Sequence, residues 1–310
     1  MIICCLFHKM QKFFIYFIEV IDLNKFNGSG VALVTPFDKD NRINYPKLYE
    51  LIDWHINSGT DYLVICGTTG EAATLSYEEK CELISKSISY AKGKIPIVCG
   101  TGSNNTSESI KLSKFANMEG SDALLVVTPY YNKGNDEGIY MHYAKIAKEV
   151  FPAPIILYNV PSRTGVDMSV DLILSLAKIP NIVAIKEASP SVEKIAKIIA
   201  GVKKENLDFN VICGNDLLTI PTLALGGIGT ISVVANIIPD KMHEICSGNT
   251  DLFYLYFDLI NALSLDVNPI MIKEAMNYLK YNVGNLRLPL CNTTESNLNK
   301  MKIIIDRTIK

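Results

Sequence analysis

The stretch IVAIKEA, residues 182–188, is a continuous apolar run that ends in a lysine and a glutamate. A strand with one exposed face alternates apolar and polar residues, whereas a strand covered on both faces is apolar throughout. Lysine is rarely buried without a partner, so Lys186 at the end of such a strand is unusual. The run predicts a buried parallel strand whose last residues carry chemistry.

Seven more runs of the same kind lie on either side of this one: 30–37, 62–67, 95–100, 123–129, 154–160, 210–214 and 229–234. Helical patterns separate them, one of which begins at a capping box formed by Ser76 and Glu79. Eight β/α units in series predict a (β/α)8 TIM barrel, an α/β fold, over residues 26–240. A doubly wound open sheet is the alternative, but no glycine-rich nucleotide loop follows the first run. Residues 241–310 contain only helical patterns, which predict a C-terminal helical appendage.

Composition narrows the function classes. The chain has 310 residues, 48% of them hydrophobic and 20% charged, with a net charge of −2. These values are typical of a globular enzyme, and they leave no basic surface for nucleic acid. The eight cysteines and four histidines show no metal-ligand spacing. We therefore expect free thiols in a reducing cytoplasm, no metal and no cofactor.

The first 25 residues contain two short apolar pieces divided by Lys9 and Lys12. They are too interrupted for a transmembrane helix and lack the cleavage site of a signal peptide. We expect an extension, residues 1–25, without a function of its own; a loose membrane-surface anchor is the less favoured alternative. The expected partners are small molecules and further copies of the chain, with no nucleic acid and no membrane.

Active sites of TIM barrels lie at the carboxyl ends of the strands. The polar residues there are one amine and several hydroxyls: Thr35, Thr68, Thr69, Tyr130, Tyr131, Tyr158 and Lys186. An amine in an apolar barrel mouth loses hydration, which favours its neutral form, and a neutral amine forms an imine with a ketone. Tyr158, one strand before Lys186, is placed to transfer the protons that this reaction needs. The alternative is that Lys186 only forms an ion pair with Glu187.

Six motifs occur in the order and spacing of one family: GTTGE (67–71), TPYYN (128–132), YNVPSRTG (158–165), IKEAS (185–189), GGIGTISV (226–233) and LRLPL (286–290). From about Phe26 to its C-terminal end, the chain resembles the dihydrodipicolinate synthases, which are Schiff-base class I aldolases. The resemblance implies condensation of pyruvate with L-aspartate 4-semialdehyde to 4-hydroxy-tetrahydrodipicolinate, the first committed step of the diaminopimelate and lysine pathway.

The resemblance also implies catalytic roles. Lys186 would form the imine with pyruvate. Tyr158, Thr68 and Tyr131 would form a proton relay, in which Tyr131 reaches into the active site of a neighbouring subunit. Such sharing implies an obligatory dimer and a homotetramer. The alternatives are that Thr68 bonds only its own loop and that Tyr131 only packs at an interface.

Four further residues match substrate-binding positions of the family. Thr69, Gly214 and Ile231 match the pocket for the pyruvate carboxylate. Arg163 matches the arginine that receives the carboxylate of aspartate semialdehyde, and the planar guanidinium suits a carboxylate. The alternative for Arg163 is a surface ion pair of little energetic value.

A possible effector site also follows from the resemblance, since some family members bind lysine at the dimer interface. Asn104 and Glu108 match its polar contacts, whereas Tyr77 and Lys80 replace its usual histidine pair. A cationic Lys80 would repel the ammonium groups of lysine, so we expect weak or absent feedback inhibition. The segment 246–267 is several residues shorter than in the family, which leaves dimer and tetramer both open.

Two other functions compete with this prediction. A sister aldolase, such as N-acetylneuraminate lyase or a keto-deoxy-sugar-acid aldolase, shares the lysine and the tyrosine. Thr68, Tyr131 and Arg163 together favour the synthase. The second competitor is a barrel without catalysis that serves as a binding module. It is disfavoured because no member of the proton relay is missing.

Overall fold

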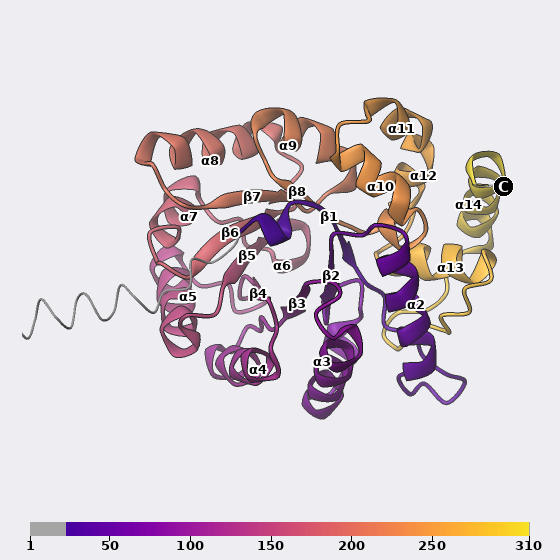
Figure 1. Ribbon diagram of the computed structural model, residues 1–310, viewed down its shortest axis with the longest axis horizontal. Coiled ribbons are helices and arrows are strands. Elements are labelled where there is room, and N and C mark those ends of the chain that lie inside the picture. Colours follow the sequence, from indigo (N-terminus) through magenta and orange to yellow (C-terminus); the bar gives the residue numbers. More distant parts are fainter. Residues whose placement is uncertain (1–22, 310) are drawn as a thin grey trace, which may run out of the picture.

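The computed structural model describes residues 23–309 of the chain. Its centre is a closed barrel of parallel strands in sequential order, β1 to β8, with helices around the outside (Figure 1). The strands are β1 Gly28–Ala32, β2 Tyr62–Ile65, β3 Ile97–Gly100, β4 Ala123–Val127, β5 Ile155–Asn159, β6 Ile182–Glu187, β7 Asn210–Cys213 and β8 Gly229–Ser232. The predicted (β/α)8 TIM barrel is confirmed. The expected extension, residues 1–25, lies almost entirely outside the described residues.

The helices between the strands are α2 Tyr45–Asn57, α3 Tyr77–Ala91, α4 Thr106–Glu119, α5 Asp136–Val150, α6 Pro161–Thr164, α7 Val170–Leu176, α8 Val192–Glu205 and α9 Thr219–Leu225. Those that follow β8 are α10 Pro239–Cys246, α11 Thr250–Leu255, α12 Phe257–Ala262, α13 Ile270–Tyr278 and α14 Glu295–Thr308. Short 3₁₀ turns lie at Leu23–Phe26, Ala72–Thr74, Asp216–Leu218 and Val234–Asn236. The helical appendage is therefore present, and α13 and α14 lie on the side of the barrel near α2 (Figure 1).

Most strands are shorter than the apolar runs that predicted them. Of the first run, 30–37, only residues 30–32 lie in the sheet, as the last part of β1. Beyond it the side chain of Asn236 replaces a neighbouring strand: its amide donates to Ala32 O at 2.8 Å and its Oδ1 accepts from Val34 N at 3.1 Å. Apolar residues thus continue past the strand because the following loop is buried, not because the strand is longer.

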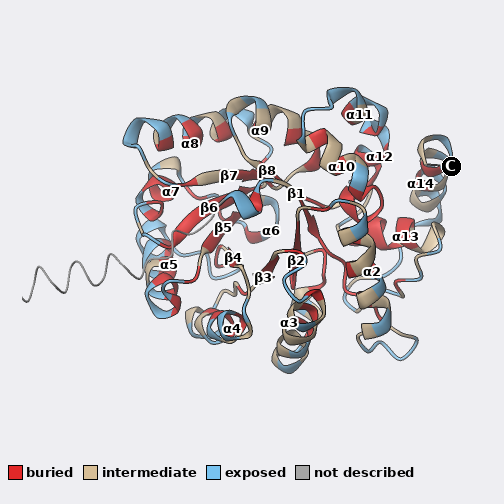
Figure 2. Cartoon of the chain, in the orientation of Figure 1, coloured by how far each residue is buried: buried red, intermediate tan, exposed pale blue. Residues whose placement is uncertain are grey.

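The core has two layers, which are visible as buried segments along the strands and the inner helix faces (Figure 2). Inside the barrel, strand side chains fill the centre: Val64, Val98, Leu125, Ile156, Val183 and Ile212. Phe26 packs edge-on against Tyr62, with ring centroids 5.8 Å apart, where the strands begin. The second layer lies between the sheet and the helices. Because both faces of each strand are covered, the strands read as continuous apolar runs.

Candidate active site

Lys186 and Tyr158 lie side by side in neighbouring strands at the carboxyl end of the barrel. The register pairs Tyr158 in β5 with Lys186 in β6. Their side chains are buried, with 7% and 6% of each residue exposed, and Lys186 Nζ is 4.5 Å from the centre of the Tyr158 ring. An amine against a phenol ring in an apolar barrel is the arrangement that imine formation with proton transfer needs.

A third strand, β7, also ends beside Lys186 and Tyr158, and Gly214 directly follows it. Its N–H donates to Glu187 O at 2.7 Å. A Cβ at this position would lie 3.1 Å from Lys186 Cε and 2.7 Å from the Cβ of Ala188. Glycine therefore lets the backbone approach the lysine stem. Ile231 in β8 is buried in the same interior cluster as Tyr158.

The side chain of Glu187 does not pair with Lys186. Successive side chains of a strand point to opposite faces, so Glu187 faces the outer layer. Its carboxylate accepts from Asn159 Nδ2 at 3.0 Å and from Ser189 N at 2.7 Å, and Lys194 Nζ lies 3.8 Å from it. Because these groups use its oxygens, Glu187 ties β6 to β5 and α8. The alternative that Lys186 only forms an ion pair with Glu187 is therefore wrong.

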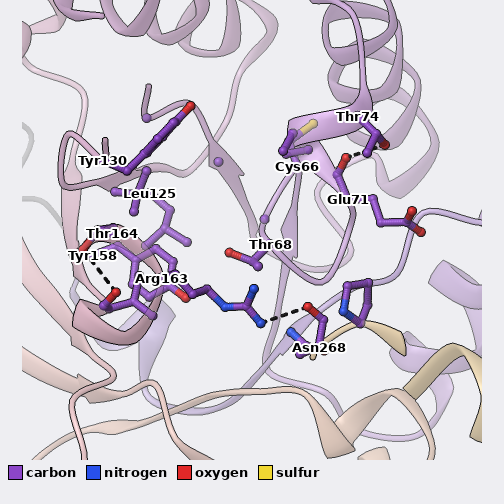
Figure 3. A pocket seen from close by; sticks show the side chains of 18 of the residues that line it. Cys66, Thr68, Glu71, Thr74, Leu125, Tyr130, Tyr158, Arg163, Thr164 and Asn268 are labelled. Carbon is purple, nitrogen blue, oxygen red and sulfur yellow. Dashed lines mark hydrogen bonds between the residues drawn. The ribbon is translucent and has the colours of Figure 1, made fainter. Parts of the chain in front are cut away.

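A cavity of about 340 Å³ opens beside this pair (Figure 3). Its polar wall includes Thr68, Tyr130, Tyr158, Arg163 and Asn268. Lys186, Thr69, Gly214 and Ile231 are not among its lining residues. Tyr158 joins the two groups, since it lines the cavity and also contacts Lys186.

Arg163 enters the cavity from α6, the single turn after β5. Its Nη2 donates to the backbone carbonyl of Asn268 at 2.9 Å, and Figure 3 shows the guanidinium pointing across the cavity toward that residue. The amide of Asn268 in turn donates to Thr69 Oγ1 at 3.0 Å. Within residues 23–309, Arg163 is thus held by a carbonyl and not by a carboxylate, which leaves its positive charge available to a ligand.

Tyr131, which was predicted to belong to the proton relay, does not line the cavity of its own chain. Tyr130 lines the cavity instead, and Tyr131 is 89% exposed. The backbone of Tyr131 has a φ of 69°, a left-handed conformation that is costly for an aromatic residue. A large apolar side chain held outward by a strained backbone is a feature that requires a functional reason.

Behind the cavity lies a cluster of charges that sequence reasoning missed. Glu71 is buried in the cavity wall, and Lys273 Nζ of α13 pairs with it at 2.6 Å. Its other oxygen accepts from Arg287 N at 2.9 Å. Burial lowers the pKa of Lys273 to about 8. The available signal was a lysine within the apolar pattern of residues 268–282, the same kind of signal that drew attention to Lys186.

Of the four residues of the possible effector site, Tyr77 and Lys80 lie on α3, Glu108 lies in α4, and Asn104 lies in the loop just before α4. Lys80 lines the cavity and forms no ion pair with the described part of the chain. Lys111 Nζ lies 3.8 Å above the ring of Tyr77, which adds a second cation to this region. Asn104 accepts from Asn132 through its backbone carbonyl, and Glu108 lies in the first turn of α4. The cavity thus extends from Tyr158 to Lys80 on α3.

Residues 23–309 contain neither a candidate metal site nor a candidate membrane-spanning helix. No group of three or more His, Cys, Asp or Glu side chains there is arranged to hold a metal ion. Within the same range, no helix combines the length and the apolar character that crossing a membrane requires.

Comparisons with known proteins agree with this geometry. The model of the dihydrodipicolinate synthetase family matches residues 25–308. The 4-hydroxy-tetrahydrodipicolinate synthase of Thermoanaerobacter sp. (strain X514) is 45% identical over 291 residues, which are 91% of this chain and 96% of that protein.

Two solved structures are similar over most of their length. One is the chloride-inhibited dihydrodipicolinate synthase of Acinetobacter baumannii complexed with pyruvate, with 41% identity, 91% of this chain and 98% of that chain covered, and a TM-score of 0.87. The other is described as the first monomeric dihydrodipicolinate synthase variant, with 36% identity, 92% and 97% coverage, and a TM-score of 0.88. By fold, site geometry and sequence, the chain belongs to the dihydrodipicolinate synthetase family.

Proposed function

We propose that this protein is an enzyme that condenses pyruvate with L-aspartate 4-semialdehyde and forms 4-hydroxy-tetrahydrodipicolinate. The observation that carries the proposal is the Lys186 amine 4.5 Å from the Tyr158 ring, beside a cavity that also holds Thr68 and Arg163. The synthase name of the Thermoanaerobacter relative and the pyruvate in the Acinetobacter structure support the same substrates.

The proposed chemistry begins when the neutral amine of Lys186 attacks the ketone carbon of pyruvate. Loss of water gives the imine, and Tyr158 is the group placed to pass protons to and from the departing oxygen. The imine draws electrons from the methyl carbon, which loses a proton and becomes an enamine. That carbon then bonds to the aldehyde carbon of the second substrate, and the aldehyde oxygen takes up a proton and becomes the 4-hydroxyl. The amino group of the second substrate then attacks the imine carbon and displaces Lys186 Nζ, which closes the ring and regenerates the free lysine. Over the whole reaction one water leaves, which places the enzyme among the carbon–oxygen lyases.

The two substrates carry carboxylates, and the site offers a group for each. Thr69, with Gly214 and Ile231 nearby, is proposed to hold the carboxylate of pyruvate. Arg163 is proposed to hold the carboxylate of aspartate semialdehyde, because no acidic side chain of the described part of the chain neutralises its guanidinium. Thr68 lines the cavity together with Tyr158, as a relay requires.

Self-association is part of the proposal. Tyr131 is 89% exposed and held at a left-handed φ, so its hydroxyl is available to a second copy of the chain. We propose a dimer in which each Tyr131 completes the relay of its partner, and a homotetramer as the assembly of dimers. The solved monomeric variant shows that one relative of this fold exists without partners. A cytoplasmic location and a place in diaminopimelate and lysine synthesis are parts of the same proposal.

The test is covalent trapping. Incubation with pyruvate and borohydride is expected to leave a stable adduct on Lys186, located by peptide mass spectrometry. Lys186→Ala should abolish it. The matched control is Lys197→Ala, which should trap as well as the wild type. Lys197 is an exposed lysine of α8 that forms an ion pair with Glu193. No adduct would refute every aldolase reading.

Turnover then separates the synthase from the sister aldolases. Enzyme that has not been treated with borohydride is expected to consume pyruvate with aspartate semialdehyde and not with N-acetylmannosamine or sugar aldehydes. Turnover on sugar aldehydes alone would refute the proposed second substrate. The family membership and the uncompensated Arg163 both disfavour the sugar substrates and the non-catalytic module.

A further inference from the structure

A segment outside the barrel reaches the candidate site. Val267, Asn268 and Pro269, directly before α13, line the cavity together with strand-end residues of β2 and β5. Within this segment, Asn268 forms hydrogen bonds both to Thr69, which follows β2, and to Arg163, which follows β5. Its side-chain amide donates to Thr69 Oγ1 at 3.0 Å, and its backbone carbonyl accepts from Arg163 Nη2 at 2.9 Å. One residue of the C-terminal region therefore touches both groups assigned to the substrate carboxylates.

The direction of the first hydrogen bond matters. A threonine hydroxyl has one proton to donate and can accept on its oxygen. Because Asn268 Nδ2 donates to Thr69 Oγ1, the oxygen is already engaged as an acceptor. The Thr69 proton is then left to point at an acceptor, and a substrate carboxylate is an acceptor only. The amide thus sets Thr69 as a donor toward the site.

The second hydrogen bond uses only the backbone of Asn268. A guanidinium has five N–H donors in a rigid plane. Among residues 23–309, the Arg163 side chain makes one donation, to the Asn268 carbonyl. That bond fixes the plane while most donors remain for a carboxylate. A substitution of the side chain leaves this carbonyl in place. The two contacts of Asn268 can therefore be separated by mutation.

The segment does not depend on Asn268 for its position. One turn further along, Lys273 of α13 pairs with the buried Glu71 in the same loop that carries Thr69. Before the segment, Asn297 Nδ2 donates to Leu265 O at 3.0 Å. These contacts anchor the segment on both sides, so variants at Asn268 are expected to fold.

We propose that Asn268 is a positioning residue for both substrate carboxylates, with its side chain acting through Thr69 on pyruvate and its backbone carbonyl acting through Arg163 on the second substrate. The proposal rests on the proposed function. Its consequence is an asymmetry: replacing the side chain should weaken pyruvate binding and spare the second substrate.

The test compares Asn268→Ala and Asn268→Asp. Asn268→Ala removes the amide that donates to Thr69. The pyruvate concentration that half-saturates borohydride trapping should then rise about tenfold, as expected for the loss of one hydrogen bond that orients the donor to a charged ligand. The KM for aspartate semialdehyde should change less than about twofold, because the carbonyl remains. Asn268→Asp keeps the shape but becomes an acceptor that competes for the Thr69 proton and repels carboxylates, so its loss of pyruvate affinity should be larger.

Asn297→Ala is the matched control, because it loosens the same segment away from the cavity. It should lower thermal stability and leave both half-saturation values near those of the wild type. If the wild type forms no adduct with pyruvate, the proposed function has failed. If the wild type forms the adduct and Asn268→Asp binds pyruvate normally, the role of Asn268 is refuted. An equal rise in both half-saturation values would also overturn it, since that result indicates general distortion.

Discussion

Gly214 offers the sharpest test of the geometry around Lys186. A Cβ added there would lie 2.7 Å from the Cβ of Ala188 and 3.1 Å from Cε of Lys186, whereas ordinary contacts begin at 3.4 Å. The lysine stem can move, but Ala188 Cβ moves only with the backbone. Gly214→Ala therefore forces the ends of β6 and β7 apart by about 0.7 Å, directly next to the amine.

The expected cost follows from that displacement. A misplacement of about 1 Å at a reacting group costs roughly 100-fold in rate, and overpacking a well-packed site costs about 1–3 kcal/mol of stability. We therefore expect imine formation by Gly214→Ala to slow by one to two orders of magnitude, on the basis of that same relation. Thermal unfolding should shift by only a few degrees. The loss is thus mainly a loss of activity.

The assay is the rate of borohydride-trapped adduct at saturating pyruvate, measured beside the melting temperature. Gly134→Ala is the control, because a Cβ there would meet only Ile139 Cγ1, at 4.0 Å. It should behave as the wild type. A trapping rate for Gly214→Ala within twofold of the wild type would show that the close approach to Lys186 has no catalytic importance.

Four further predictions follow from other parts of the molecule. Lys273→Met leaves the buried Glu71 carboxylate without its cation, so the free energy of unfolding should fall by about 3–5 kcal/mol. Adding Glu71→Gln to this variant should recover part of the loss in melting temperature. Mixing inactive Tyr131→Phe with inactive Lys186→Ala should restore up to about a quarter of wild-type turnover if two subunits share each site; no recovery would argue against the shared relay. Assays with L-lysine should find no half-inhibition at sub-millimolar concentration, and Lys80→His should increase inhibition. Burial lowers the pKa of His55 to about 3, so below about pH 6.5 the unfolded chain binds a proton at His55 that the folded chain does not bind. The free energy of unfolding should therefore fall by up to about 1.4 kcal/mol per pH unit between pH 6 and 4. If His55→Leu shows the same pH dependence of its melting temperature as the wild type, this prediction is wrong.

Several features could be predicted from the sequence because they are local. Continuous apolar runs at regular intervals specified parallel strands covered on both faces, and their number and order specified the barrel. Lys186 at the end of one run, and Tyr158 at the end of the run before, had to become neighbours once sequential strands paired in parallel. Six short motifs in order were enough to indicate the family.

The strand ends could not be read from hydrophobicity. Val34 and its neighbours are apolar and buried, yet the side chain of Asn236 holds them outside the sheet. Two residues 202 positions apart make that hydrogen bond. No local pattern reports such a partner.

The roles of the long-range polar contacts were also decided by the tertiary structure. Glu187 stands next to Lys186 in the chain, but strand geometry turns it to the opposite face, where it meets Asn159. Asn268 lies 199 positions from Thr69 and 105 from Arg163, and only the packing of α13 against the barrel brings the three together. The sequence by itself thus determined the barrel, its reactive lysine and the family, because strand pairing follows from local periodicity. The supports of the site were settled by tertiary packing, because hydrogen bonds between distant polar residues leave no periodic trace in the chain.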